Sequence, residues 1–108
     1  MTSCAMVSPE YVAPEILLFR EYDGYAADVW SLGVCLYTML QGRYPFYPNL
    51  VSYLNRLAQV NHIQFCNPQA SIQAIDLIRY GMLRADPLDR FTVWEIKQHF
   101  WYRRVPVQ

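Results

Sequence analysis

The segment from Val29 to Leu40 constrains the fold more than any other part of the chain, because it is apolar on nearly every side of a helix. Asp28, which precedes it, is a residue type that caps helix N-termini. Gly42 suits the left-handed position that ends a helix, and Pro45 prevents its continuation. The sequence therefore predicts a helix over residues 29–41, capped by Asp28, that needs neighbours all round it.

Shorter patterns predict the remaining elements. Apolar residues at helical spacing predict a surface helix over about residues 49–60 and another over about residues 71–84. Thr92 and Glu95 form the capping box of a last helix over about residues 93–100. A short helix fits about residues 15–20, and turns fit about residues 21–24 and 86–90. The predicted fold class is mainly α, with about four helices and irregular connections.

Composition narrows the class of protein. The 108 residues suffice for one small domain, and nine Lys and Arg balance nine Asp and Glu. That balance argues against a nucleic-acid footprint and against a polybasic membrane surface. Cys4, Cys35 and Cys66 form no C-x-x-C pair, which argues against zinc and favours reduced cysteines in a cytosolic or nuclear protein. No apolar segment reaches the ~20 residues that span a bilayer, and residues 1–5 lack signal-peptide features.

Five short motifs follow one another along the chain: Ala13-Pro14-Glu15, Asp28-Val29-Trp30-Ser31, Gly42-Arg43-Tyr44-Pro45-Phe46, Asp86-Pro87-Leu88-Asp89-Arg90 and Glu95-Ile96-Lys97-Gln98-His99-Phe100-Trp101. The first is the A-P-E that closes the activation segment of protein kinases. The others resemble the start of the central helix of the kinase C-terminal lobe, the G-x-x-P-F after it, the D-P-x-x-R loop and the close of the domain. Residues 7–102 thus resemble a Ser/Thr protein kinase of the calmodulin-dependent-kinase group. Sucrose-nonfermenting-type kinases, checkpoint kinases and Tribbles pseudokinases look similar here, and the motifs do not choose among them.

The resemblance implies a partial kinase C-terminal lobe, made of the end of the activation segment and about four helices, with the N-terminal lobe absent. Residues 1–102 would be the partial kinase domain and residues 103–108 a C-terminal tail.

Structural roles for four residues are implied by the same resemblance. Glu15 should pair with Arg90 and so pin the end of the activation segment to the helical base; two unrelated surface charges are the alternative. In the family, Asp28 also bonds the catalytic loop, which this sequence lacks, so the N-cap role remains for it. Trp30 should pack beneath the A-P-E turn, which amounts to a core tryptophan.

Ser8, Pro9 and Tyr11 match the kinase loop that lines the pocket for the substrate residue just after the phosphoacceptor. The resemblance therefore implies that these three residues bind substrate. Ordinary loop residues are the alternative, since the catalytic loop does not occur in this sequence.

The sequence departs from the kinase pattern at three places. Val7 stands where Gly is usual, and Phe100 stands where Pro is usual. Near Tyr80 and Gly81 the chain has one residue more than the family pattern, which a π-bulge would absorb.

The parts that phosphoryl transfer requires do not occur in the sequence. The four glycines make no phosphate-binding loop, and the only lysine, Lys97, lies in the last predicted helix. H-R-D and D-F-G are missing, and His62 and His99 make no metal site. We therefore expect no catalytic, cofactor-binding or metal-binding residue here, whereas a complete parent kinase would use ATP and Mg²⁺.

Two functional hypotheses follow. In the first, the chain is a fragment of a Ser/Thr protein kinase whose parent phosphorylates proteins, and is inactive alone. In the second, it is a non-catalytic, pseudokinase-like module that binds a client or a partner kinase. Under both, the partners are proteins rather than nucleic acid or membrane, and the location is cytoplasmic or nuclear. Uncovered apolar surface on the central helix would also allow self-association. A helical protein unrelated to kinases is a third, remote option.

Overall fold

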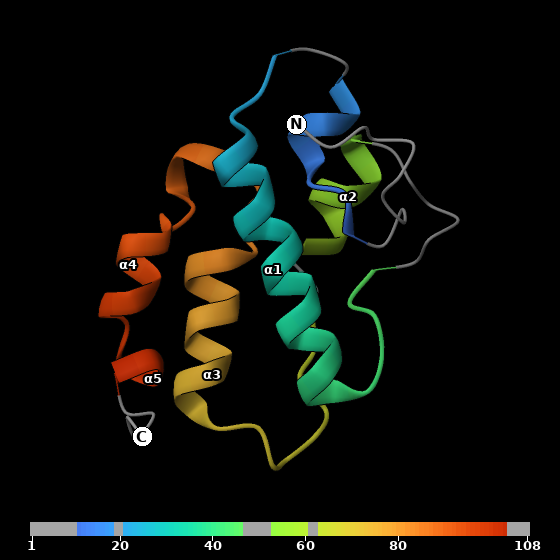
Figure 1. Ribbon diagram of the computed structural model, residues 1–108. Helices are drawn as coiled ribbons and strands as arrows, with labels where there is room; N and C mark the ends of the chain where they lie inside the picture. The colour runs from blue at the N-terminus through green and yellow to red at the C-terminus, as the bar shows by residue number, and fades with distance from the viewer. Residues whose placement is uncertain (1–10, 19–20, 47–52, 61–62, 104–108) are drawn as a thin grey trace.

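The computed structural model describes residues 11–18, 21–46, 53–60 and 63–103, and these residues are mainly helical, as predicted (Figure 1). No strand occurs in these ranges. The elements are a 3₁₀ turn η3 (Pro14–Leu18), helices α1 (Gly24–Gln41), α2 (Tyr53–Val60) and α3 (Ile72–Leu77), a π-helical turn η4 (Ile78–Met82), a 3₁₀ turn η5 (Pro87–Asp89) and helices α4 (Val93–Gln98) and α5 (Phe100–Arg103).

Helix α1 runs through the middle, with α3, α4 and α5 on one side and η3 with α2 on the other (Figure 1). Trp30, Val34 and Tyr37 bury one part of its surface in a cluster that includes Ala13 and Phe46. A second cluster joins α1 to α3, η4 and α4. Cover on several sides of α1 is what its apolar sequence required.

The predicted N-cap of this helix was wrong. Helix α1 begins at Gly24, and Oδ1 of Asp23 accepts hydrogen bonds from the backbone N–H groups of Tyr25 (2.9 Å) and Ala26 (3.4 Å). Asp28 lies inside the helix and is exposed. The last two residues of the turn expected over residues 21–24 are therefore the N-cap, Asp23, and the first residue of the helix, Gly24. The other end agrees with the prediction, since Gly42 terminates α1 with φ 74°.

The predicted π-bulge is present. Helix α3 passes directly into η4, where Leu83 N–H donates to the Ile78 carbonyl at 2.8 Å, five residues back. Gly81 lies in this turn, and a Cβ there would lie 2.6 Å from the ring of Phe91. The turn therefore absorbs the extra residue while the backbone of Gly81 packs against an aromatic ring.

The last helix, predicted over about residues 93–100, ends at Gln98 and is followed by the separate short helix α5. Thr92 and Glu95 form the expected capping box of α4, which ends before His99, whose extended backbone (ψ 146°) separates it from α5. The His99 ring fixes this break: Nε2 lies 2.7 Å from Oδ2 of Asp76 on α3, and Nδ1 accepts from Trp101 N–H at 3.0 Å. Helix α2 covers the later part of its predicted range, and residues 49–52 lie outside the described residues.

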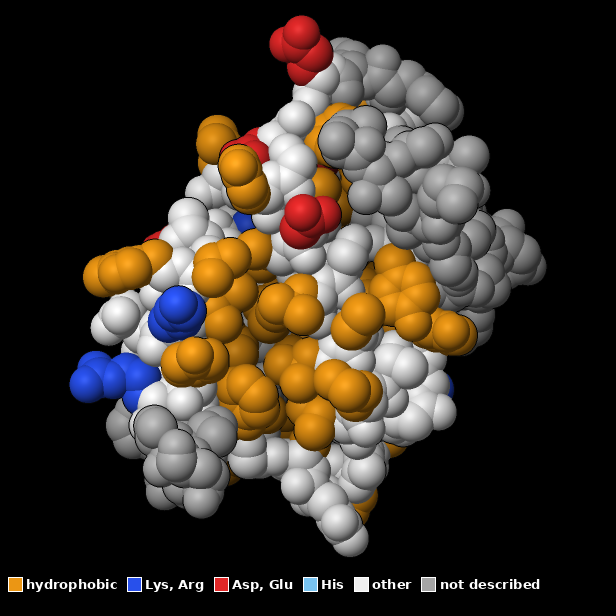
Figure 2. All heavy atoms as spheres, in the orientation of Figure 1, with side chains coloured by type: hydrophobic (Ala, Val, Ile, Leu, Met, Phe, Trp, Pro, Cys, Tyr) orange, Lys and Arg blue, Asp and Glu red, His pale blue; other side chains and the backbone are white. Residues whose placement is uncertain are grey.

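Part of α1 is left uncovered. Leu32 and Met39 are exposed, and Cys35 and Leu36 are half-buried. Figure 2 shows apolar side chains gathered over the middle of this face. An exposed apolar surface on the central helix was expected from its composition.

Candidate functional site

A buried ion pair joins two segments that lie 75 residues apart in the sequence. Nη1 of Arg90 donates to Oε2 of Glu15 at 2.6 Å, and Nη2 donates to Oε1 at 2.9 Å. Both residues are buried. The two parallel bonds have the fork-to-carboxylate geometry that gives Arg–carboxylate pairs their strength and directionality. This is the pairing that the motifs implied, and it fixes the turn η3 onto the loop that follows η4.

Arg90 also organises the loop to which it belongs. Nε and Nη2 both donate to the carbonyl of Arg84, at 3.0 and 2.9 Å, and Nη2 donates to that of Ala85 at 3.3 Å. Nη1 donates in addition to the carbonyl of Ala26 near the start of α1, at 2.9 Å. One guanidinium therefore connects η3, α1 and the loop after η4, and its positive charge is balanced by Glu15. We call Glu15, Arg90 and these carbonyls the anchor.

Trp30 lies against the anchor from the α1 side. It is fully buried, the guanidinium carbon of Arg90 lies 5.1 Å from its ring, and Phe46 stacks on it with ring centroids 5.4 Å apart. Ala13 of the A-P-E motif belongs to the same cluster. Trp30 thus packs in the core next to the A-P-E turn, and its ring face adds a cation–π contact to the ion pair.

The predicted substrate residues are only partly covered by the structure. Ser8 and Pro9 lie outside the described residues. Tyr11 is half-buried; its carbonyl accepts a hydrogen bond from the Ser31 hydroxyl at 2.8 Å, and its ring meets that of Tyr44 edge-on at 5.7 Å. Helix α1 therefore fixes the backbone that immediately precedes the A-P-E motif.

Two contributors were missed by the sequence reasoning. The Ser31 hydroxyl holds the Tyr11 backbone, and Ser31 had been treated only as part of a motif. Arg56 on α2 is fully buried with its guanidinium carbon 4.6 Å from the Phe46 ring, although the helix was predicted to lie on the surface. The sequence did contain one indication that Arg56 is buried: it lies between two leucines, Leu54 and Leu57. A long cationic side chain in such a place can pack over an aromatic ring.

One titrating group is perturbed near this site. Burial raises the pKa of Tyr37, and the nearby positive charge of Arg43 opposes that shift. The phenol donates to the carbonyl of Gln64, and Arg43 Nη2 donates to the same carbonyl at 3.3 Å. Tyr37 is therefore held as a neutral donor that ties α1 to the segment before α3.

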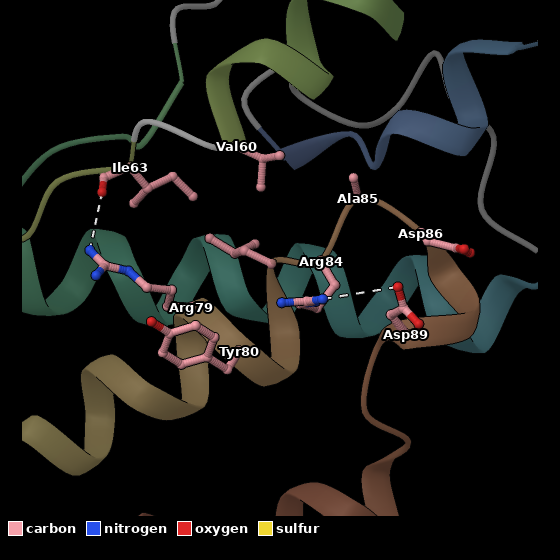
Figure 3. A pocket seen from close by; sticks show the side chains of 9 residues that line it. Val60, Ile63, Arg79, Tyr80, Arg84, Ala85, Asp86 and Asp89 are labelled. Atoms are coloured by element: carbon pink, nitrogen blue, oxygen red, sulfur yellow. Dashed lines mark hydrogen bonds and ion pairs between the residues drawn. The ribbon is translucent and has the colours of Figure 1, made fainter.

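A polar cavity of about 540 Å³ lies beside the anchor (Figure 3). Arg79 and Arg84 line it together with Asp86, Asp89 and Tyr80. Arg79 Nη2 donates to the carbonyl of Ile63 at 3.2 Å, and Arg84 lies 4.0 Å from Asp89. Because two arginines and two aspartates line the cavity, their charges balance and the lining shows no preference for an anion or a cation.

The described residues contain neither a candidate metal site nor a candidate membrane span. No group of three or more His, Cys, Asp or Glu there could hold a metal ion. No helix among them is long and apolar enough to cross a membrane.

Comparison with known proteins places the sequence in a family. Residues 2–102 match the family model described as the protein kinase domain. The chain belongs to the protein kinase domain family. It is 48% identical over 99 residues to Tribbles homolog 1 of Homo sapiens, a match that covers 90% of this chain and 26% of that protein.

Other relatives are protein kinases of plants. The chain is 39% identical over 107 residues to the abscisic acid-inducible protein kinase of Triticum aestivum, covering 94% of this chain and 32% of the relative. It is 38% identical over 104 residues to CBL-interacting protein kinase 26 of Oryza sativa subsp. japonica, covering 95% and 20%. The chain therefore spans about a third or less of the length of these relatives.

Proposed function

We propose that these residues form the substrate-side base of a Ser/Thr protein kinase domain, whose complete form transfers the γ-phosphoryl group of ATP to Ser or Thr of a protein. The observation that supports this most directly is the bidentate Glu15–Arg90 pair, which holds the end of the activation segment onto the helical base. Catalysis of phosphoryl transfer rests on positioning together with electrostatic stabilisation, so a rigid base under the substrate-binding loop would serve the positioning.

The proposed role of the substrate-binding loop is supported by its hydrogen bond to α1. Ser8, Pro9 and Tyr11 would line the pocket for the substrate residue after the phosphoacceptor. Because Ser31 holds the carbonyl of Tyr11 at 2.8 Å, movement of this end of the loop is restricted. A pocket built on fixed backbone discriminates between substrates better than one built on a loose loop.

We further propose that the chain of 108 residues transfers no phosphate by itself. The printed sequence carries neither the strand lysine and Gly-rich loop for the ATP phosphates nor the acidic residues for Mg²⁺. ATP and Mg²⁺ would be bound by other residues of a complete kinase. That protein would act in the cytoplasm or nucleus, where free cysteines such as Cys35 and Cys66 stay reduced.

The test begins with the gene: extending the open reading frame upstream should reveal H-R-D and D-F-G motifs. Transfer of radiolabelled phosphate to a protein substrate should then occur with the extended product and not with the chain of 108 residues. An extended product without these motifs, or without activity, would contradict the proposal.

A matched pair of variants tests the substrate role in the extended enzyme. Ser31→Ala removes the bond to the Tyr11 carbonyl, whereas Thr38→Val removes a hydroxyl that only donates to the Val34 carbonyl of its own helix. Since one hydrogen bond contributes roughly 0.5–1.5 kcal/mol, we expect Ser31→Ala to raise KM for a peptide by about two- to tenfold. Thr38→Val should leave KM unchanged.

The second candidate function is a non-catalytic module that binds proteins. The uncovered apolar residues of α1, Leu32 and Met39, favour it, as does the resemblance to the Tribbles pseudokinases. Thermal unfolding of the extended product with and without Mg²⁺-ATP discriminates the two, because only a nucleotide-binding kinase gains stability from its ligand.

A further inference from the structure

A groove of about 580 Å³ lies between the start of α1 and the start of α4, with the loop over residues 87–91 as its third wall. Figure 1 shows that the N-terminal end of α1 and this loop lie side by side. We call it the α1–α4 groove. It shares Ala26 and Arg90 with the anchor, and its other lining residues have so far been given structural roles only.

Four large apolar side chains line this groove and remain largely exposed: Tyr25 (82%), Leu88 (91%), Val93 (56%) and Trp94 (69%). They come from three separate segments, and each segment is fixed by its own hydrogen bonds. Tyr25 N–H donates to Asp23, and Leu88 N–H donates to Asp86 at 2.9 Å. Val93 lies between Thr92 and Glu95, the two residues of the capping box. Aromatic side chains such as Tyr25 and Trp94, gathered with other apolar residues in a pre-formed groove, are typical anchors of protein recognition.

The charge of the groove is negative. Asp23 and Glu95 line it, and each uses one carboxylate oxygen to cap a helix: Oδ1 of Asp23 and Oε1 of Glu95, which accepts Thr92 N–H at 2.9 Å. The half-charge at each helix start offsets only part of each carboxylate. Arg90 is the one cation among the lining residues, and it is buried against Glu15.

Charged residues just outside the groove add negative charge on α1 and positive charge on α4. Asp28 is exposed one helical turn after Tyr25, on the same side of α1. Lys97 is exposed one turn after Trp94 but does not line the groove. The groove therefore combines apolar contact area with a carboxylate on two of its walls.

We propose that the α1–α4 groove binds a segment of a partner protein that carries one or two large apolar side chains flanked by lysine or arginine. The apolar side chains would pack between Tyr25, Leu88 and Trp94. The flanking cations would lie near Asp23 and Glu95, where opposite charge selects among partners and speeds their association. The groove is a different surface from the substrate-binding loop, so this inference does not depend on the proposed kinase activity.

The test uses a positional-scanning library of short synthetic peptides and the full chain, carried in its complete open reading frame where that is longer. Central positions of the peptides vary among apolar residues, and flanking positions vary among lysine, glutamate and serine. Binding is measured by fluorescence anisotropy of the labelled peptides. We expect selection of a bulky apolar centre with lysine flanks. Selection of glutamate flanks, or no retention of any peptide at high micromolar protein, would overturn the proposal.

Variants then locate the bound peptide. Trp94→Gln and Leu88→Ser each remove an exposed apolar contact, and each should weaken binding of the selected peptide by about tenfold or more, as expected of anchor residues. The matched control is Ile72→Ser, which removes an equally exposed apolar side chain from α3, outside the groove. Equal losses for Ile72→Ser and Trp94→Gln would show nonspecific adhesion and refute the assignment.

The double variant Asp23→Asn/Glu95→Gln isolates the charge. Asn still caps helix starts and Gln still completes a capping box, so both helices keep their caps while the groove loses two carboxylates. We expect affinity to fall about two- to fivefold at low salt and its salt dependence to flatten. Unchanged affinity would contradict the charge argument. A dimer in light scattering that Trp94→Gln abolishes would assign the groove to a second copy of this chain and refute the proposed partner.

Discussion

The anchor makes a quantitative prediction about Arg90. Replacing it with methionine keeps a long apolar stem in contact with Trp30 but removes the guanidinium. Glu15, which is only 8% exposed, then loses both hydrogen bonds that Arg90 donates to it. The carbonyls that Arg90 had bound, those of Ala26, Arg84 and Ala85, lose a donor as well. The variant therefore leaves the Glu15 carboxylate and the carbonyls of Arg84 and Ala85 without the donor that Arg90 supplied, whereas the Ala26 carbonyl still lies within α1.

The expected loss is large relative to the total stability. Removing one partner of a buried pair costs about 3–5 kcal/mol, and stranded carbonyls move Arg90→Met towards the upper end of that range. Small domains are stable by about 5–15 kcal/mol in total. Glu15→Gln should cost less, about 1–3 kcal/mol, because the amide oxygen still accepts a hydrogen bond and Arg90 keeps its carbonyl partners. Because the two side chains touch, the double variant should cost less than the sum, by about 1–3 kcal/mol.

Urea unfolding followed by far-UV circular dichroism measures these free energies. Arg84→Met is the matched control, because Arg84 is 40% exposed on its side chain and its nearest acidic partner, Asp89, is 4.0 Å away; its loss should be within about 0.5 kcal/mol. If Arg90→Met does not fold, Arg90→Lys keeps the charge without the fork and should give a measurable intermediate loss. A cost for Arg90→Met as small as that of Arg84→Met, or strictly additive losses in the cycle with Glu15→Gln, would refute the anchor.

Three further predictions use the same unfolding measurement. Asp23→Ala should cost about 0.5–2 kcal/mol as the loss of an N-cap, while Asp28→Ala should stay within about 0.5 kcal/mol; the reverse order would restore the cap predicted from sequence. Gly81→Ala should destabilise by about 1–3 kcal/mol because its Cβ would overlap an aromatic ring at 2.6 Å, whereas Gly24→Ala, with nothing within 4 Å, should be neutral or stabilising. Since burial raises the pKa of Tyr37, its contribution is complete below the unfolded pKa of about 10 and is lost as pH rises through the folded value. Stability should therefore fall above about pH 10, and less steeply in Tyr37→Phe; equal slopes for both proteins would contradict this.

Three features were predicted correctly from the sequence: the Glu15–Arg90 pair, the π-turn near Gly81 and the capping box of α4. The order of motifs placed Glu15 and Arg90 together although 75 residues separate them. One surplus residue near Gly81 was enough to predict the π-turn, because a helix that must keep its packing face can absorb an insertion in this way. Thr92 and Glu95 satisfied the capping-box pattern and formed it.

The start of α1 was misplaced because two residues could cap it. Asp23 and Asp28 are both acceptable N-caps, and the residues between them include Gly24, which made a turn the simpler expectation. Packing decides the matter: Ala27 is buried in the core cluster, and the Ala26 carbonyl accepts from Arg90. Both positions need a helix that begins before residue 28. Tertiary contacts of this kind have no local signal in the sequence.

The break between α4 and α5 was missed for a related reason. Residues 93–100 have no Pro or Gly to interrupt a helix, so the sequence predicted one continuous helix over that range. His99 stops it through contacts on both ring nitrogens, one with Asp76 on α3 and one with the N–H of Trp101. The ring replaces helical bonding of the Trp101 N–H, and the change of direction lets Trp101 pack against the cluster around Val29 and Ile96.

The anchor and the α1–α4 groove are structurally linked, because the loop that contains Arg90 belongs to both. Arg90 draws the carbonyls of Arg84 and Ala85 towards the core, and Asp86 holds Leu88 N–H, so the loop turns sharply and leaves Leu88 at its exposed tip. The inward bonds stabilise the fold, and the outward side chain is free for a partner. Loss of Arg90 should therefore disturb both stability and partner binding, whereas loss of Leu88 should disturb binding alone, since its side chain is 91% exposed. A surface whose shape depends on a buried ion pair is fixed before the partner arrives, and this lowers the entropy cost of binding.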